Sequence, residues 1–353
     1  MRIAILGAGW AGRVHARAYA EVPGCEVVVI WSRDEARAQA IVADAAPAAR
    51  VERSCEAAAA APDVDLVSVC LPNAMHEPFA CTALAAGKDV VCEKPLAHSR
   101  AAGARMVAAA RAASRRLYYA EECLFAPRYA RVVALVGAGA VGEPFFARQE
   151  EKHKGPYADW FFRLEHAGGG ALADMGCHGI ALLGRVMGGR PVVRVFADLR
   201  TYVHGARTSL EDHALVHLVF EGGGTALSES AWTQKGGMES RLEVHGRDGL
   251  VAADLAKGYG VTLVSDREVE GRAPGLSRPA VAWAFENGYP QELAHFVAAH
   301  RAGAPGESTG EDGLAVLEVM EAAYRSAGLG RPVELPLEPA SEDRPLADHW
   351  LRP

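Results

Sequence analysis

Hydrophobic positions in the first third of the chain form short continuous runs separated by alanine-rich stretches. Such runs predict buried strands, and the stretches between them predict helices. The expected strands are Arg2–Leu6, Glu26–Ile30, Asp65–Cys70, Asp89–Cys92 and Leu117–Ala120. The expected helices are Gly12–Ala20, Asp34–Ala46, His76–Ala86 and Ser99–Ala113. This alternation favours a parallel, doubly wound α/β sheet.

The pattern changes after about residue 122. From Pro191 onward, alternating segments follow one another with glycine-rich turns and no helices between them, which predicts an antiparallel sheet with one covered face. These segments are Val192–His204, Asp212–Glu221, Thr225–Thr233, Arg241–His245 and Val261–Val264. Flanking helices are expected at Ala171–Met187, Gln291–Arg301 and Glu311–Ala327.

Composition narrows the class of protein. The 353 residues are half apolar and carry a net charge of −7, which argues against a nucleic-acid partner. No leader-like or membrane-spanning apolar run is present, so we expect a soluble, cytoplasmic protein without a membrane partner. None of the seven cysteines forms a C-x-x-C pair, which argues against a disulfide framework or a zinc site.

Gly7-Ala8-Gly9-Trp10-Ala11-Gly12 directly follows the first strand and opens a helix. In this motif the first glycine permits a tight turn, the second lets the backbone approach a pyrophosphate, and the third lets helix and strand pack closely. The strand–turn–helix context indicates dinucleotide binding, and the alternative is a purely structural turn.

The residue that ends the second strand chooses between NAD and NADP. An acidic residue there would bind the ribose of NAD, but this chain has Ser32 and Arg33, with Arg37 one turn later. These residues favour NADP as the cofactor, with NAD as the alternative. In the other interpretation, Arg33 stacks on the adenine and Asp34 only caps the helix.

Two further segments carry candidate chemistry. Lys94, in Glu93-Lys94-Pro95, follows a strand whose carboxyl end should face the cofactor, where an amine can donate to a substrate oxygen. Asp174 and His178 follow the glycine run Gly168–Gly170 and are four residues apart, hence on one helix face. An aspartate that orients a neutral histidine makes a general base. The alternative for Lys94 is an ordinary exposed loop, and the alternative for Asp174 and His178 is a pair on a helix surface.

On these segments the chain resembles the Gfo/Idh/MocA oxidoreductases. The glycine turn, Glu93-Lys94-Pro95, Gly168–His178, Gly310–Gly313 and Gly330–Val333 carry the resemblance along nearly the whole chain. It implies an NAD(P)-binding Rossmann domain over residues 1–121 and an α+β domain with an open, mainly antiparallel sheet over 122–335. That second domain would bind substrate and form a homodimer or homotetramer. Residues 336–353 are expected to form a proline-rich, poorly packed tail.

The resemblance also assigns roles. Lys94, Asp174 and His178 would be catalytic, with His178 as proton acceptor and no metal required. The segment Leu71-Pro72-Asn73, together with His76, Glu93 and Lys94, would line the cofactor. Glu122 departs from the family pattern and would lie near the nicotinamide or the substrate.

A cluster before the glycine run suits a polyhydroxylated ring, because it combines aromatic and charged side chains. Its members are Lys152, His153, Tyr157 and Trp160, and Tyr289 is a weaker substrate candidate. Trp232 and Trp283 are expected to be core or interface aromatics.

Together these features predict a dehydrogenase that moves a hydride between NAD(P) and a secondary alcohol or ketone of a sugar, glycoside or cyclitol. The main alternative is a non-catalytic NAD(P)-sensing regulator on the same fold. A third hypothesis is reduction of an imine or a tetrapyrrole-type acceptor.

Overall fold

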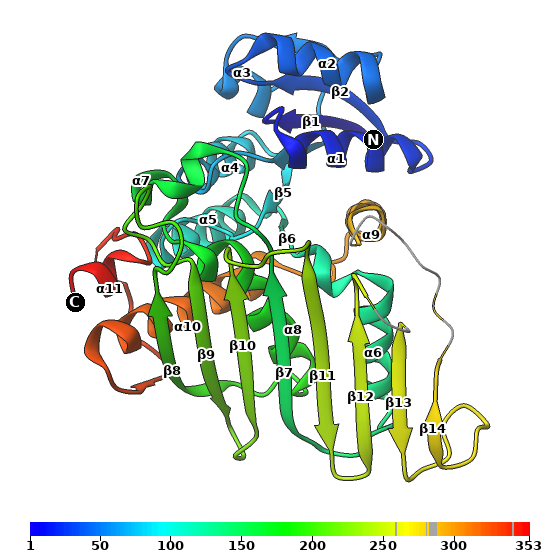
Figure 1. Ribbon diagram of the computed structural model, residues 1–353. Coiled ribbons are helices and arrows are strands. Elements are labelled where there is room, and N and C mark those ends of the chain that lie inside the picture. Colours follow the sequence, from blue (N-terminus) through cyan, green and yellow to red (C-terminus); the bar gives the residue numbers. More distant parts are fainter. Residues whose placement is uncertain (258–259, 280, 282–287, 341) are drawn as a thin grey trace. The chain divides into compact units, whose positions relative to one another are not determined.

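The computed structural model describes residues 1–257, 260–279, 281, 288–340 and 342–353 (Figure 1). It contains two compact units: residues 1–122 with 289–317, and residues 123–288 with 318–353. The sequence placed 289–317 in the second domain. In the structure this segment belongs to the first unit, because α9 (Tyr289–Ala302) packs against α1 (Trp10–Glu21). The predicted Trp283 lies outside the described residues.

The first unit is built on a six-stranded parallel sheet with strand order β3-β2-β1-β4-β5-β6. Its strands are β1 (Arg2–Leu6), β2 (Glu26–Trp31), β3 (Arg50–Glu52), β4 (Leu66–Val69), β5 (Asp89–Glu93) and β6 (Leu117–Ala120). Its other helices are α2 (Glu35–Ala45), α3 (Cys55–Ala59), α4 (His76–Ala85) and α5 (Arg100–Ala113). The continuous apolar runs become strands buried on both faces, so the prediction of a doubly wound sheet is confirmed.

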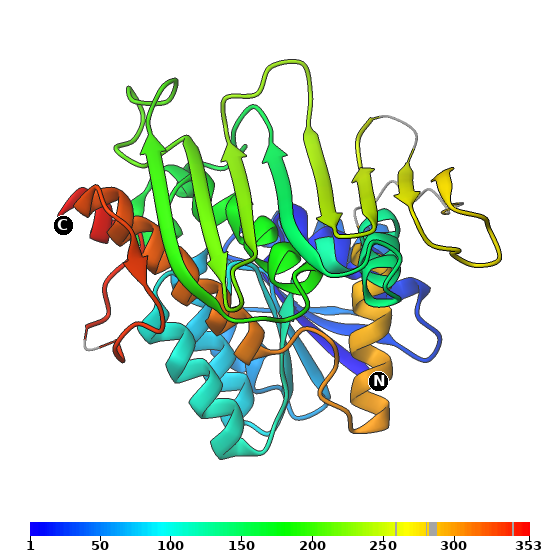
Figure 2. The same ribbon diagram turned by 90° about the horizontal axis from the view of Figure 1, so that it is seen from below.

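The second unit contains a nine-stranded open sheet with order β14-β13-β12-β11-β7-β10-β9-β8-β15 (Figure 2). Its strands are β7 (Pro144–Lys152), β8 (Val192–Arg200), β9 (His213–Phe220), β10 (Thr225–Ala231), β11 (Glu239–Gly246), β12 (Gly249–Asp254), β13 (Val261–Ser265), β14 (Gly275–Ser277) and β15 (Val333–Glu334). Strands β7 and β10 pair in parallel, and the other pairs are antiparallel. The expectation of a mainly antiparallel sheet is therefore confirmed.

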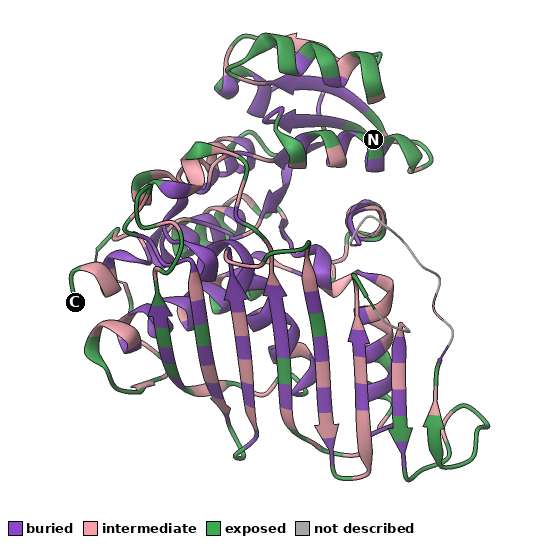
Figure 3. Ribbon diagram, in the orientation of Figure 1, coloured by how far each residue is buried: buried purple, intermediate pink, exposed green. Residues whose placement is uncertain are grey.

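Burial alternates along these strands, as the banding in Figure 3 shows. In β8, Val195, Ala197 and Leu199 are buried, whereas Phe196 is 42% exposed. Helices cover one face: α8 (Cys177–Val186) packs on β7 and β10, and α6 (Pro127–Gly137) packs on β12 and β13. The opposite face carries the exposed residues of the alternation.

Three more helices complete the described chain: α7 (Leu164–Ala167), α10 (Gly310–Leu329) and α11 (Asp348–Leu351). The expectation of a poorly packed tail is wrong at its end, because Leu346 and Ala347 are fully buried and the Ala347 amide donates to the Gly168 carbonyl at 2.8 Å. In the described part of the chain, no helix combines the length and apolar character needed to cross a membrane.

Candidate functional site

In the turn from β1 to α1, each of the three glycines of Gly7–Gly12 has its own structural reason. Gly7 has φ +110°, and a Cβ there would collide with the Cys70 carbonyl. A Cβ on Gly12 would collide with the Gly7 carbonyl and press on Ile5, so this glycine lets α1 pack on β1. Above Gly9 nothing in the described structure lies within 4 Å of such an atom. Gly7 and Gly12 are thus required by the packing of the fold, whereas Gly9 leaves its backbone accessible to a ligand.

The N-terminus of α1 is suited to an anion. Gly9 caps the helix without a side-chain hydrogen bond, so the first amides keep their donor capacity. Trp10, the first residue of the helix, is 68% exposed. A pyrophosphate accepts hydrogen bonds from such amides and is favoured by the helix dipole. The predicted cofactor turn therefore fits a dinucleotide.

The segment after β2 shows how the predicted cofactor-selecting residues are used. Asp34 caps α2, accepting from the amides of Ala36 and Arg37 at 3.1 and 3.3 Å. The Arg37 guanidinium also pairs with the Asp34 carboxylate at 3.2 Å. Arg33 is exposed and Ser32 partly exposed. Asp34 is thus occupied by its own helix, and the Ser32 hydroxyl accepts from the Asp34 amide at 3.2 Å, while Arg33 faces solvent.

Glu93 ends β5 in a buried network that sequence reasoning missed. Its Oε1 lies 3.0 Å from His15 Nε2, and His15 Nδ1 lies 2.7 Å from the Ser68 hydroxyl. Glu93 Oε2 accepts from the Lys94 amide at 3.1 Å. Burial alone would raise the pKa of Glu93, but the hydrogen bond and charge of His15, together with Lys94, hold that pKa below its ordinary value. Glu93 therefore anchors the backbone of Lys94.

His76 ties two predicted cofactor-lining segments together. Its Nε2 lies 2.9 Å from the Leu71 carbonyl, and its Nδ1 lies 3.1 Å from the Pro95 carbonyl. Burial lowers the pKa of this imidazole, and the surrounding carbonyls oppose that shift. Asn73 is buried next to it on a short helical turn. His76 thus holds the segment before α4 against the segment that follows Lys94.

Acidic residues gather at the carboxyl ends of β5 and β6. Glu121 and Glu122 are buried directly after β6, and Glu292 on α9 is fully buried. Neither carboxyl oxygen of Glu292 has a hydrogen-bond partner in the described structure. Burial, with the nearby charges of Glu122, Glu93 and Glu121, raises its pKa far above the ordinary value. The predicted Tyr289 packs against Trp10 and His15, at ring-centroid distances of 5.4 and 5.9 Å.

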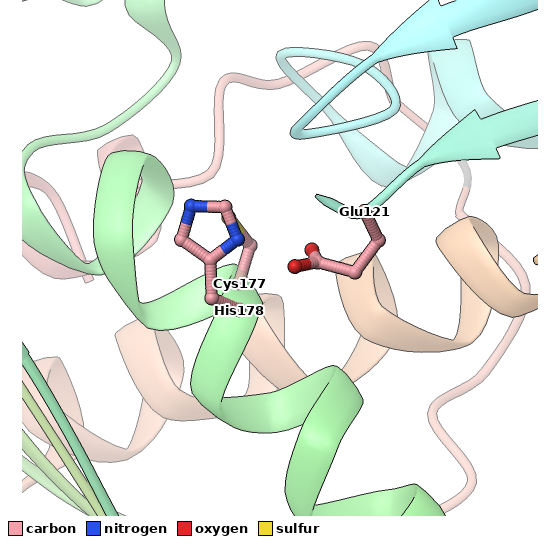
Figure 4. Close-up of side chains that lie close together, drawn as sticks. All are labelled: Glu121, Cys177 and His178. Carbon is pink, nitrogen blue, oxygen red and sulfur yellow. The ribbon is translucent and has the colours of Figure 1, made fainter. Parts of the chain in front are cut away.

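In the second unit, Asp174 lies on a π-helical turn over Leu172–Gly176 that leads into α8. A π-turn is wider than an α-turn and is frequent at functional sites. His178 is 3% exposed near the start of α8, where Figure 4 draws it beside Cys177. Figure 4 also draws Glu121, which follows β6 of the first unit. The predicted helix is therefore real, but its first turn is not α-helical.

Two aromatic side chains converge on the carboxylate of Asp174. The Trp232 indole donates to Oδ2 at 2.9 Å, and His153 Nε2 lies 3.5 Å from the same oxygen. His153 Nδ1 accepts from the Gly155 amide at 2.9 Å, which places the proton of a neutral ring on Nε2. Trp232 is fully buried, so of the expected core or interface positions it occupies the core, and its bond to Asp174 was not predicted.

The structure separates the predicted substrate residues of the second unit. His153 joins Asp174, whereas Lys152 lies on the other face of β7, with Glu150, Glu229 and Glu239 at 2.9, 3.4 and 3.8 Å. The α8 face of β7 instead carries Gln149, next to Gly179. Because neighbouring residues on a strand point to opposite faces, Lys152 is not brought together with Asp174 and His178.

The two remaining members lie at the surface end of this segment. Tyr157 is 90% exposed, with the Lys154 ammonium 5.5 Å from its ring centroid. The Trp160 ring stacks on the Phe161 ring, with 3.7 Å between the ring centroids. Their assignment to substrate stays a prediction, as does the expectation that no metal is needed.

Comparisons with known proteins identify the family. Residues 1–121 match the model described as the oxidoreductase family with an NAD-binding Rossmann fold, and residues 129–252 match the GFO/IDH/MocA C-terminal domain. This chain belongs to the Gfo/Idh/MocA oxidoreductases. The resemblance noted from the sequence is therefore confirmed, and with it an oxidoreductase with an NAD-binding Rossmann domain.

Relatives align over nearly the whole length of this family member. Inositol 2-dehydrogenase of Rhizobium meliloti (strain 1021) is 27% identical over 95% of this chain and 99% of its own. The 1,5-anhydro-D-fructose reductase of Ensifer adhaerens is 29% identical over 95% of this chain and 98% of its own. Among solved structures, GenD2 from gentamicin A biosynthesis, in complex with NAD, is 32% identical with a TM-score of 0.85, covering 96% of this chain and 97% of its own.

Proposed function

We propose that this protein is an NAD(P)-dependent dehydrogenase that acts on a secondary alcohol, or the corresponding ketone, of a sugar, glycoside or cyclitol. The observation that carries the proposal is that the family's Lys94, Asp174 and His178 all occur in a chain whose Gly9 backbone is open to a dinucleotide. Full-length relatives named inositol 2-dehydrogenase and 1,5-anhydro-D-fructose reductase support this substrate class.

In the oxidising direction, the proposed chemistry divides among three side chains. Lys94 polarises the substrate oxygen, and His178 accepts the hydroxyl proton. Asp174, held by Trp232 and His153, supports the base or binds a substrate hydroxyl. The nicotinamide, when bound, supplies the hydride acceptor. Catalysis then comes mainly from positioning and from proton transfer, which contributes about 10²–10⁴-fold.

The cofactor preference is a separate proposal. Ser32 and Arg33 lie in place of the acidic residue that would hold an NAD ribose, and Arg33 is exposed, so we propose that NADP binds more tightly than NAD. The similar GenD2 was solved with NAD, which makes NAD the direct competitor. Titration of protein fluorescence with each oxidised cofactor decides the question, and tighter NAD binding would refute the preference.

The open face of the nine-stranded sheet supports a homodimer or homotetramer. Phe196 and Leu215 are 42% and 41% exposed on neighbouring strands, next to charged residues such as Asp198 and Glu229. A mixed apolar and charged surface of this kind suits a second copy of the chain. Light scattering coupled to size exclusion should give a mass of two or four chains, and Phe196→Glu should shift it toward one.

Turnover with a panel of inositols, aldoses, glycosides and aminosugars tests the main proposal. Reduced nicotinamide is followed by near-ultraviolet absorbance for the wild type, Lys94→Ala, His178→Ala and the exposed control Lys154→Ala. We expect turnover in the wild type and the control, with losses of at least 10²-fold in the other two. Tight cofactor binding without turnover across the panel would favour the sensing regulator instead.

A further inference from the structure

Glu211 is a buried carboxylate that accepts hydrogen bonds from the glycine run before Asp174; we call this set of bonds the grip of Glu211. It is fully buried between β8 and β9, in the second unit. Its Oε1 accepts from the Gly170 amide at 3.0 Å, the Leu172 amide at 3.0 Å and the Tyr324 hydroxyl at 2.7 Å. Its own backbone carbonyl accepts from the Ala171 amide at 2.9 Å. Three consecutive amides, those of residues 170–172, therefore bind one residue.

The glycine run is shaped around this grip. A Cβ on Gly170 would collide with the Glu211 carbonyl and lie 2.9 Å from its Oε2. A Cβ on Gly169 would collide with the Tyr324 hydroxyl. No larger residue fits at either position without moving Glu211 or Tyr324. The space above these glycines is filled by protein.

A continuous set of hydrogen bonds links Glu211 to Asp174. The Gly170 carbonyl, one peptide from the gripped amide, accepts from the Asp174 amide at 3.0 Å. On the other side of the carboxylate, Trp232 donates its indole to Asp174, and its backbone amide donates to the Asp212 carbonyl at 2.8 Å. The adjacent residues Glu211 and Asp212 thus hold both the backbone of Asp174 and its side-chain partner.

We propose that Glu211 is a positioning residue, whose carboxylate sets the place of Asp174 through the Gly168–Leu172 turn and makes that placement sensitive to pH. The catalytic consequence rests on the function proposed above. The structural part, control of this turn by one carboxylate, does not depend on it.

The electrostatics of the pocket agree with the geometry. Burial raises the pKa of Glu211 to about 7, although the bonds from Tyr324 and from the Leu172 and Gly170 amides oppose the shift. In the described structure the titratable group that contacts it is Tyr324 on α10, while the carboxylate of the next residue, Asp212, accepts from the amides of residues 202–204. Oε2 has no hydrogen-bond partner in the described structure, so it is the oxygen open to a proton.

The sign of the effect follows from acceptor strength. An ionised carboxylate is a stronger acceptor than a carboxylic acid, so the grip on residues 170–172 is tight above about pH 7 and loosens below it. A raised folded-state pKa also means that the native protein binds more protons than the unfolded chain. For global unfolding, which exposes Glu211, this contribution to stability is therefore present at low pH and is lost as the pH rises through about 7. Local opening of the turn has the opposite sign, because it leaves Glu211 buried and breaks only the amide bonds that lower its pKa, so protonation of Glu211 favours that opening.

Hydrogen exchange of the full chain, read by mass spectrometry, tests the structural part without any substrate. After correction for intrinsic exchange, protection of the peptide covering residues 165–178 should fall between pH 8 and pH 6 in the wild type. It should stay level in Glu211→Gln, which keeps a neutral acceptor. The matched control Glu165→Gln changes an exposed carboxylate close to the same turn and should behave like the wild type.

Steady-state kinetics test the catalytic part. Because the wild type and Glu211→Gln share every other titratable group, the ratio of wild-type kcat to Glu211→Gln kcat isolates Glu211. This ratio should fall several-fold from pH 8 to pH 6 at unchanged KM. Glu211→Ala should lose about 10- to 100-fold in kcat.

Each outcome is decisive. A wild-type protection profile in Glu211→Gln overturns the proposal even if Glu211→Ala fails to fold. A level kcat ratio with altered protection rejects the catalytic consequence. Absence of turnover in the wild type, with the exchange difference present, rejects the proposed function and leaves the role of Glu211 standing.

Discussion

Two glycine-rich turns, one in each unit, look alike in the sequence and do opposite things. At Gly7–Gly12 the space above the second glycine is open, and the helix after it offers uncapped amides. At Gly168–Gly170 the space is filled by Tyr324 and Glu211, and the amides are bound by the Glu211 carboxylate. The amides of the first turn are open to an anionic ligand, whereas amides of the second turn are already bound by a carboxylate of the same chain.

The difference shows what a glycine run encodes. In both turns glycine is needed because something approaches the backbone closely, since a Cβ would block it. Whether that partner is a ligand or a side chain depends on residues far away in the sequence, here Glu211 and Tyr324. Alanine scanning of these glycines therefore separates positions that serve the fold from positions that serve a ligand.

Gly7→Ala should have the largest effect. It forces a Cβ into a positive-φ residue and against the Cys70 carbonyl, both of which are backbone features that cannot yield easily. We expect a loss of about 4 kcal/mol or more in the free energy of unfolding of the first unit. Urea denaturation followed by circular dichroism measures it, and an unchanged midpoint would show that the turn relaxes.

Gly170→Ala should come second, with a loss of about 3 kcal/mol and of any turnover, because the added methyl collides with Glu211. Gly184→Ala in α8 is the matched control. Nothing described lies within 4 Å of its Cβ, so it should stabilise the helix by up to about 1 kcal/mol. Equal melting temperatures for the two variants would contradict the filled-space interpretation.

Gly9→Ala should leave the fold intact and weaken the cofactor. Its φ of −78° suits alanine, and its Cβ meets open space in the described structure. Where a pyrophosphate must approach the backbone, the same methyl should raise the Kd of reduced cofactor by about tenfold, or about 1.4 kcal/mol. Fluorescence titration measures it. Unchanged affinity with unchanged stability would place the pyrophosphate elsewhere.

Trp232→Phe should have the smallest effect, about 1 kcal/mol in stability, because it removes one donor from a buried carboxylate while keeping most of the ring. Thermal unfolding checks the stability, and kcat should fall more than KM changes. A stability equal to that of the wild type would mean that His153 or water replaces the indole at Asp174.

Much of the fold was predictable because its signals are local. The five predicted strands of the first unit appear within one or two residues of their expected ends. Strand β7 was missed, although it lies in the middle of the second sheet. Its buried face carries the polar residues Gln149 and Glu151: Gln149 donates to the Glu151 carboxylate at 3.0 Å, and Glu151 also accepts from the Ser240 hydroxyl. Buried polar pairs of this kind hide the alternation on which strand prediction depends.

The site was predictable to a different degree in each unit. Glycine spacing and the Glu93-Lys94-Pro95 segment indicate a cofactor turn and a lysine directly from the chain. His15, Trp232, Glu211 and Tyr324 carry no such spacing signal, since these bonds join residues at least 39 positions apart in the chain. Because β7 was missed, the sequence also did not show that Lys152 pairs with the carboxylates of Glu150 and Glu229; its assignment to substrate stays a prediction.

The sequence by itself determined the family, the parallel and antiparallel sheets and the candidates for the reactive side chains, because those depend on local periodicity and short motifs. Only the tertiary structure decided which glycines are open, which carboxylates are held ionised or poised to take a proton, and which face of β7 bears Lys152. Burial and hydrogen bonding are set by residues brought together from distant parts of the chain. No local pattern records them.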